Sequence, residues 1–139
     1  HTATSFDFGS RGYLRPMTLI LARDKSLESL REALEAKRTL ALAFDNLCGE
    51  EQLLKDFFTA SIRTELLDVN GEGVATMLVT NCTSVSYVVR LADGMQIPLD
   101  SFTTVSLTSA PKAKTLKFEV LNMWTGVDSH PIIELELNK

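Results

Sequence analysis

Several kinds of sequence feature are absent from this chain of 139 residues, and each absence argues against a class of function. No run or stripe of lysine and arginine occurs, and 18 acidic residues outnumber 14 basic ones, which gives a net charge of −4. This balance argues against a nucleic acid held through its phosphates. No apolar stretch approaches the roughly 18–20 residues that span a bilayer. The sequence therefore predicts neither a nucleic-acid partner nor membrane insertion.

Cysteine and histidine are scarce, with two of each. Cys48 and Cys82 lie far apart in the sequence, and we expect two plain thiols that serve as small apolar side chains. His1 and His130 lie near opposite ends, and no C-x-x-C pair occurs, so the sequence contains no zinc signature. The triplet Asn81–Thr83 matches a glycosylation sequon, but it lies inside a predicted strand and carries little weight.

The first third of the chain reads as strand, helix, strand, helix. Met17–Ala22 is an apolar run typical of a buried strand, and Thr39–Phe44 is a second one. Between them, Ser26 is a predicted N-cap before leucines at helical spacing. This order predicts a right-handed parallel βαβ unit. Two such strands cannot bury their apolar runs alone, so they either join an edge of the following module or complete a sheet that precedes this chain.

The rest of the chain changes from helical to alternating periodicity. A second helix is predicted from about Gly49 to Ser61. The alternating segments after it predict an antiparallel sandwich, with strands at 63–69, 74–81, 84–91, 101–108, 115–124 and 131–138. The predicted fold class is α+β, a small βαβ-α segment over residues 1–62 followed by an antiparallel immunoglobulin-like β-sandwich over residues 63–139.

The beginning of the chain resembles the C-terminal part of bacterial PHP (polymerase and histidinol phosphatase) domain proteins, a family of metal-dependent phosphoesterases. The matching motifs follow in the family's order and spacing: Arg15-Pro16, Thr18, the helix "SLESLREAL" at Ser26–Leu34, Arg38-Thr39, and "GEEQL" at Gly49–Leu53. The likeness covers residues 1–62 by motif and the remainder by pattern only.

The resemblance implies that residues 1–62 are the α/β tail of a PHP-type catalytic domain, and that the missing N-terminal PHP barrel is their partner. His1 falls near the last histidine of the family's Asp-x-His motif, which implies a metal ligand. The Asp of that motif and the other histidine and carboxylate ligands are absent here. A cluster of divalent metal ions (zinc, manganese or iron) is thus implied for the parent protein, and neither cofactor nor catalysis is expected of this chain alone. The resemblance also favours a periplasmic or exported protein, with a cytoplasmic one as the alternative.

The residues themselves offer few candidate binding sites. Asp45 and Asn46 follow a predicted strand, where ligands often bind in α/β folds. Arg15 precedes a strand and is a candidate anion ligand, although a structural ion pair is the preferred explanation. His130 is expected to be a solvated loop residue, and Trp124 is expected to pack in the core or at its rim.

Three functional hypotheses remain open. In the first, the chain is a non-catalytic fragment that supports a phosphoesterase or limits its substrate range. In the second, it is a free-standing β-sandwich binding or adaptor module that engages a protein partner at a sandwich edge. A purely structural domain without a ligand is the third.

Overall fold

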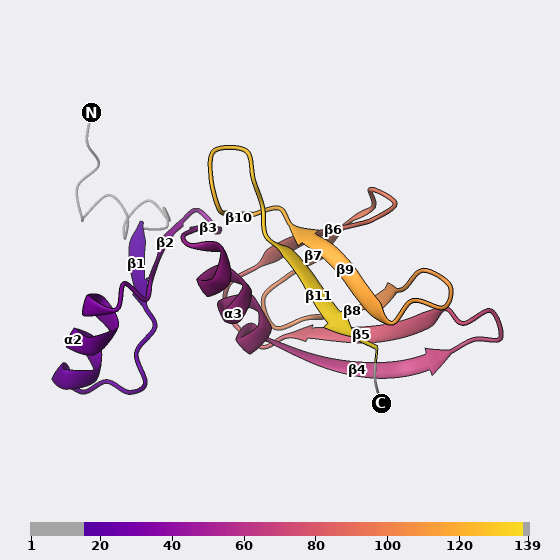
Figure 1. Cartoon of the computed structure of the whole chain (residues 1–139), viewed down its shortest axis with the longest axis horizontal. Helices are drawn as coiled ribbons and strands as arrows, with labels where there is room; N and C mark the ends of the chain where they lie inside the picture. The colour runs from indigo at the N-terminus through magenta and orange to yellow at the C-terminus, as the bar shows by residue number, and fades with distance from the viewer. Residues whose placement is uncertain (1–15, 138–139) are drawn as a thin grey trace.

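The computed structural model describes residues 16–137, whose arrangement is shown in Figure 1. This part of the chain contains two helices and three β-sheets, and its strand pairs are antiparallel except for one. The α+β class is thereby confirmed in a β-rich form, whereas the immunoglobulin-like label stays a prediction. No helix in this part is long and apolar enough to cross a membrane.

Strands from both ends of the described chain form one sheet, which we call the junction sheet. It contains β1 (Met17–Ile20), β2 (Thr39–Ala43), β3 (Asn46–Cys48) and β10 (Met123–Trp124), in the order β1-β2-β3-β10. β3 lies between the predicted strand Thr39–Phe44 and the predicted second helix, where the sequence predicts no strand. It forms a strand because β10 pairs with it in parallel, and because β2 pairs with its other side.

The predicted parallel βαβ unit is wrong, because β1 and β2 are antiparallel neighbours. Met17 lies opposite Leu42, and Ile20 lies opposite Thr39. A parallel crossover needs a helix that carries the chain back to the start of the first strand. Here β2 begins beside the end of β1, so the connection is not a crossover. The helix in this connection, α2 (Leu27–Glu35), lies at one end of the molecule beside β1 and β2 (Figure 1).

The N-cap of α2 lies where the sequence predicts it. Ser26 is the N-cap, and its Oγ accepts a hydrogen bond of 3.1 Å from the backbone N–H of Ser29. At the other end, Lys37 has a φ of 56° and its N–H donates to the carbonyl of Leu34. A left-handed residue directly after a helix reverses the chain. The chain can therefore enter β2 two residues later.

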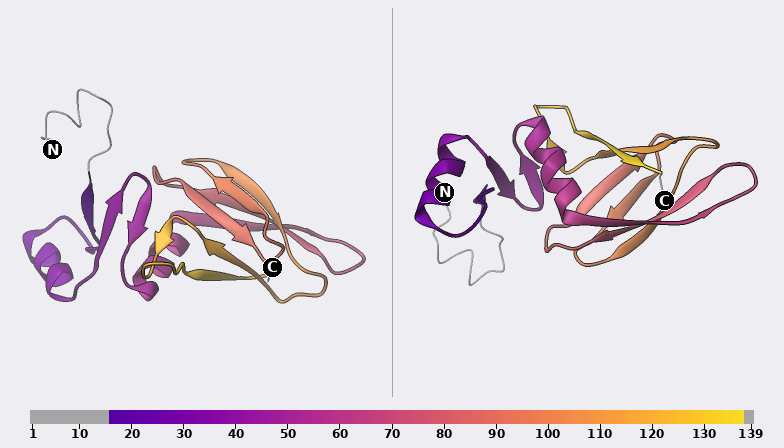
Figure 2. Two further views of the ribbon diagram at one scale, coloured as in Figure 1. Left: turned by 90° about the horizontal axis from the view of Figure 1, so that it is seen from above. Right: turned by 60° about the horizontal axis from the view of Figure 1, so that its bottom comes forward.

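Two further sheets form the sandwich (Figure 2). One contains β4 (Ile62–Val69), β5 (Ala75–Asn81) and β8 (Thr104–Thr108) in the order β4-β5-β8. The other has the order β11-β9-β6-β7 and contains β6 (Tyr87–Leu91), β7 (Gln96–Leu99), β9 (Thr115–Val120) and β11 (Ile132–Glu136). The predicted alternation is confirmed in β9, where Leu116, Phe118 and Val120 are buried.

The sequence missed two features of the sandwich. β7 lies in a predicted turn, and it contains Pro98, which occurs in strands at sheet edges such as this one. The predicted strand over residues 115–124 is interrupted after Val120, because Leu121 and Asn122 carry the chain from the sandwich to the junction sheet.

The helix α3 (Glu51–Ser61) connects the junction sheet to the sandwich, and Figure 1 shows it between them. The ring of Phe58 meets Tyr87 at 4.9 Å and Phe118 at 5.7 Å between centroids, both edge-on. Leu40 and Met123 of the junction sheet belong to the same hydrophobic core. One core thus extends across the position at which residues 1–62 meet residues 63–139, and the division into two domains there stays a prediction.

Both cysteines are free thiols, as predicted, but both are exposed instead of buried as small apolar residues. Asn81, the first residue of the sequon, is fully buried. Its side-chain amide donates to the carbonyls of Val85 and Leu99 at 2.7 and 3.2 Å, and its Oδ1 accepts from Thr83. These bonds give Asn81 a structural role at the end of β5.

Candidate functional site

The structure describes two of the four residues predicted to bind a ligand or metal. His1 and Arg15 lie outside the described residues. Asp45 and Asn46 lie at the turn between β2 and β3, on the side of the molecule where β10 pairs with β3. The candidate site is therefore built around this turn.

The β2–β3 turn has a backbone conformation that its residues do not favour. Phe44 and Asp45 have φ angles of 50° and 63°. Two residues with positive φ between antiparallel strands are typical of a type I′ hairpin, which prefers Asn-Gly. A side chain in this region costs roughly 1 kcal/mol or more. The side chain of Phe44 gains little burial in return, because 59% of the residue is exposed.

Asn122 holds the turn against the sandwich. Its Nδ2 donates to the carbonyl of Asp45 at 2.6 Å and to that of Ser86 at 2.7 Å. Its Oδ1 accepts from the N–H of Val88 at 3.0 Å. The amide thus satisfies three backbone groups from two segments. The sequence analysis gave Asn122 no role, although it continues the alternation of Phe118 and Val120, and an inward amide in an apolar pattern signals a buried hydrogen-bond network.

Trp124 and His130 complete the cluster. The indole N–H of Trp124 donates to Asn46 Oδ1 at 2.9 Å, and its ring lies 4.3 Å from that of His130. His130 Nδ1 lies 2.8 Å from the carbonyl of Met123. Because a carbonyl only accepts, Nδ1 is the nitrogen that carries a proton in this contact. His130 is partly buried, so the prediction of a solvated loop histidine is wrong, whereas rim packing of Trp124 is confirmed.

The hydrogen bonds of this cluster fix backbone and rings, and they leave little for chemistry. The Oδ1 of Asn46 accepts a hydrogen bond from Trp124, and the carbonyl of Asp45 accepts one from Asn122. Ser129, the neighbour of His130, lies 2.7 Å from Thr125 Oγ1, so it does not face the imidazole as a nucleophile would. Among residues 16–137, no group of three or more histidine, cysteine or acidic side chains is placed to hold a metal ion. The arrangement suits a docking or packing function.

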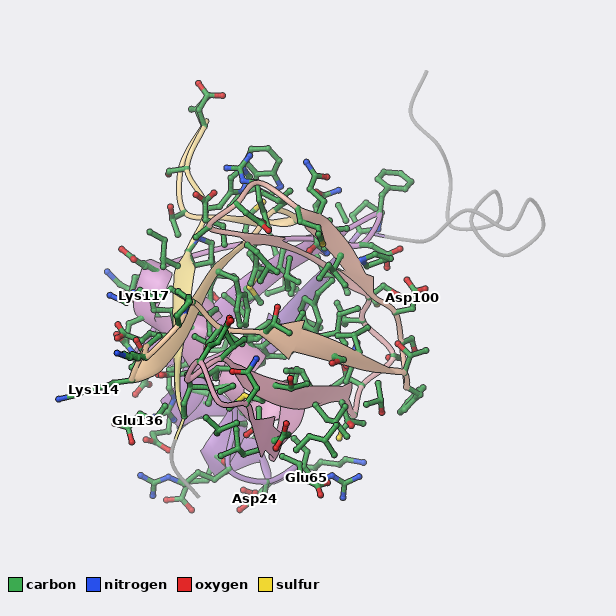
Figure 3. All side chains as sticks on the ribbon, turned by 90° about the vertical axis from the view of Figure 1, so that its right-hand side faces the viewer. Asp24, Glu65, Asp100, Lys114, Lys117 and Glu136 are labelled. Carbon is green, nitrogen blue, oxygen red and sulfur yellow. The ribbon has the colours of Figure 1, made fainter. Side chains whose placement is uncertain are left out.

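The cavities of the described chain lie elsewhere. One cavity, of about 530 Å³, opens at the ends of β6, β8 and β9, and Asp93, Lys114 and Lys117 are among its lining residues. The two lysines lie on the same side of the molecule (Figure 3). A second cavity of about 310 Å³ shares Lys117 and adds Arg90 and Glu119, which form an ion pair at 2.6 Å. None of the predicted site residues lines either cavity.

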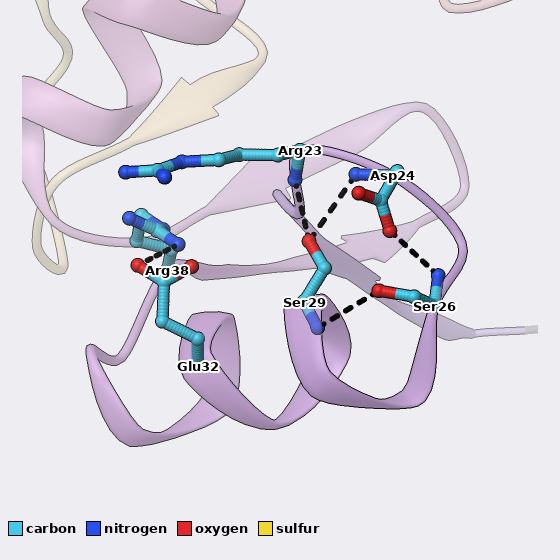
Figure 4. A network of polar contacts seen from close by, with 6 residues as sticks. All are labelled: Arg23, Asp24, Ser26, Ser29, Glu32 and Arg38. Atoms are coloured by element: carbon cyan, nitrogen blue, oxygen red, sulfur yellow. Dashed lines mark hydrogen bonds and ion pairs between the residues drawn. The ribbon is translucent and has the colours of Figure 1, made fainter.

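A polar network surrounds the start of α2 (Figure 4). Ser29 Oγ accepts from the N–H groups of Arg23 and Asp24, and Asp24 Oδ1 accepts from the N–H of Ser26 at 2.7 Å. Hydrogen bonds from Ser26 lower the pKa of the Asp24 carboxyl. The first turn of the helix is thus capped by residues of this segment, so the network has a structural explanation.

Arg38 lies beside the same network, under the extended side chain of Arg23 (Figure 4). Its Nη2 is 3.1 Å from Glu32 Oε1, which is close enough for an ion pair. Neither Nη2 nor Nε makes a well-directed hydrogen bond within the described residues, although both atoms are buried. The pair therefore contributes charge attraction but little directional bonding.

Known proteins provide one relevant likeness. No model of a protein family and no curated protein matches the chain. A solved structure does, with a TM-score of 0.78 and 27% sequence identity over 94% of this chain. It is described as a two-domain protein from Bacteroides vulgatus ATCC 8482 that contains a predicted PHP-like metal-dependent phosphoesterase.

The length of that neighbour places the match in context. The chain spans 41% of its residues, so more than half of the neighbour has no counterpart here. The likeness extends over both the helical first part and the sandwich, since it covers 94% of the chain. The resemblance of this chain to a region of PHP-type proteins, predicted from its motifs, is thereby confirmed.

Proposed function

We propose that this chain is the C-terminal, non-catalytic part of a metal-dependent phosphoesterase of the PHP type. The observation that carries the proposal is the likeness to a two-domain protein with such a domain, of which the chain spans only 41%. The motif order in residues 15–53 supports the same reading independently of the fold. In this proposal the parent hydrolyses a phosphomonoester or a phosphodiester.

The parts of the parent differ in their roles. The preceding barrel holds divalent metal ions, namely zinc, manganese or iron, which supply an activated water and positive charge near the phosphate. This chain contributes at most His1 as a ligand. The cluster around Asn122 and Trp124 supports a structural or access-limiting role. Its polar side chains are engaged in hydrogen bonds that hold strands and rings in place.

Three finer statements belong to the same proposal. Residues 1–62 are the α/β tail of the catalytic domain, and residues 63–139 are an immunoglobulin-like sandwich. Arg15, Asp45 and Asn46 remain candidate ligand-binding residues. The protein is periplasmic or exported, or else cytoplasmic, which rests on the resemblance alone.

The alternative is a free-standing adaptor that binds a protein partner by strand addition. The edge strand β4 favours it, because β4 spans eight residues and exposes Leu67 and Val69. A register shift between Leu66 and Asp68 interrupts its ladder. Such irregularities protect edges from pairing, so β4 is a poor template.

One experiment separates the two functions. An antibody to this chain reports the mass of the native polypeptide in its source cells. The native polypeptide is then purified and assayed with p-nitrophenyl phosphate and bis(p-nitrophenyl) phosphate in zinc, manganese or iron(II). We expect the native polypeptide to be much larger than 139 residues and to lose its activity on these two substrates when the metal is chelated. The 139-residue chain is expected to hydrolyse neither substrate. A native species of only 139 residues would overturn the proposal and favour the adaptor.

A further inference from the structure

The register of the junction sheet separates its side chains onto two faces, because residues paired across strands project to the same side. Leu40 pairs with Leu19, Leu42 pairs with Leu47, and Leu47 pairs with Met123. This inner face packs into the core, where Leu40, Leu47 and Met123 are buried. The opposite side, which we call the outer face, is centred on Ala41, Ala43 and Cys48, flanked by Thr18 and Ile20 on β1 and by Trp124 on β10.

The outer face is open and carries no charge. Thr18, Ile20, Ala41 and Cys48 are exposed, and Trp124 is partly exposed. Of the eight residues on it, which include Thr39 and Asn46, none is acidic or basic. A solvated sheet face in an antiparallel fold normally carries polar and charged residues.

The same protein provides the contrast. The solvated face of the β11-β9-β6-β7 sheet carries Lys117 paired with Glu134 at 3.6 Å, and Arg90 paired with Glu119 at 2.6 Å. Charges are thus present on a sheet face that water covers. Their absence from the outer face indicates a surface that water does not cover in the complete protein.

We propose that the outer face is the docking surface for the domain that precedes this chain in its parent polypeptide. The inference rests on the proposed function, which supplies that domain. β1 is an edge strand of the junction sheet and the first described element, so the preceding chain arrives at this sheet. A domain joined to the chain ahead of β1 would be tethered near this edge strand, and therefore near the junction sheet.

The side chains define the chemistry of the partner surface. Ala41, Ala43 and Cys48 are small, so the centre of the face is shallow, and Ile20 and Trp124 rise at its two sides. An apolar ridge from the preceding domain fits between them. A charged group there would be buried without a partner of opposite sign, so the ridge is uncharged.

The two free cysteines provide the test and its internal control. Cys48 lies at the centre of the outer face, and Cys82 lies on the sandwich, directly after β5. The folded native polypeptide is treated with a maleimide, and peptide mass spectrometry reports the labelling rate of each thiol. We expect Cys48 to react at least about tenfold more slowly than Cys82. The maleimide reaches Cys48 only in the small fraction of molecules in which the two domains are undocked. In urea the two thiols react at equal rates.

Two variants sharpen the result. Ala41→Glu places a charge beside Cys48, and we expect it to raise the labelling rate of Cys48 to that of Cys82. Ser106→Glu adds the same charge at an exposed position of β8, and it leaves Cys48 protected. Protection that survives Ala41→Glu would mean that something other than docking hides the thiol, which overturns the proposal.

The remaining outcomes distinguish this inference from the proposed function. Equal labelling of Cys48 and Cys82 in a large, active, metal-dependent polypeptide overturns the docking surface but leaves the phosphoesterase proposal standing. Protection of Cys48 that disappears on dilution means that a second copy covers the face, which also overturns the inference. A native polypeptide of only 139 residues removes the basis of both proposals.

Discussion

Asn122 shows how one side chain can determine whether two sheets stay joined. Its amide bonds the carbonyls of Asp45 and Ser86 and the N–H of Val88, and these groups belong to segments more than 30 residues away from it. No apolar residue of similar size can replace these bonds, because it would leave polar backbone atoms without partners.

We predict that Asn122→Ala lowers the free energy of unfolding by about 2–3 kcal/mol, because partly buried backbone groups lose their partners. Urea denaturation followed by circular dichroism measures the change. Asn46→Ala is the matched control, since its amide bonds only Phe44 and Trp124 near the surface. The control is expected to lose about 1 kcal/mol or less. Equal losses in the two variants would show that Asn122 does not hold the junction.

The strained turn at Phe44 and Asp45 gives a prediction of opposite sign. The double variant Phe44→Asn, Asp45→Gly supplies the pair that two positive φ angles favour, while Asn46 is kept. We expect the free energy of unfolding to rise by about 1–2 kcal/mol, as judged by the urea midpoint. If stability falls instead, the phenyl ring makes a contact that its exposure does not suggest.

The ionisation of Tyr87 makes the free energy of unfolding depend on pH in the alkaline range. Burial raises the pKa of its phenol, and hydrogen bonds with Ser61 and Thr83 oppose this only in part. Above pH ~10 the unfolded chain loses the phenolic proton while the folded chain retains it, so stability is lost as pH rises through this range. Tyr87→Phe removes this dependence. We expect the stability difference between the two proteins to shift in favour of the variant above pH ~10, and a constant difference would contradict the assignment.

The secondary structure elements differ in how well the sequence predicts them. α2 and α3 are predicted because caps and apolar spacing are local signals, as Ser26 and the leucines of α2 illustrate. β3 is missed because it is very short and depends on pairing with β2 and β10, and β10 is not separated from β9 because its partner β3 lies about 75 residues away. The direction of β2 is missed because the apolar runs of β1 and β2 carry no information on which end of the strand the chain returns to.

Phe58 tests the role of α3 as the connecting element. Its ring is fully buried between Tyr87 and Phe118, so Phe58→Ala leaves a large cavity at the meeting point of the junction sheet and the sandwich. We predict a loss of about 3–5 kcal/mol in the free energy of unfolding. Phe102→Ala is the matched control, because 69% of Phe102 is exposed, and it is expected to change stability by about 0.5 kcal/mol or less. A small effect at Phe58 would mean that α3 is dispensable to the core.

At the scale of the whole molecule, the sequence predicts the candidate site only in part. Asn46 and Trp124 are recognisable as polar or aromatic residues at strand ends, but their mutual hydrogen bond depends on the pairing of β3 with β10. The outer face could not be found at all, because its residues alternate with core residues along strands whose partners were unknown. Periodicity identifies a face of a strand, and only the sheet order shows which faces combine.

The last prediction concerns where metal ions bind in the proposed parent protein. The described part of this chain brings together no group of three or more metal-binding side chains, and His1 is a single imidazole. Because a ligand stabilises only the fold that binds it, manganese or zinc should raise the melting temperature of the native polypeptide's barrel. The same ions should leave the melting temperature of the 139-residue chain unchanged within about 1 °C, since one imidazole binds too weakly to matter. Scanning calorimetry with ion and with EDTA measures both. An increase of several degrees in the isolated chain would place a metal site within it, and the assignment of the metal centre to the preceding domain would be wrong.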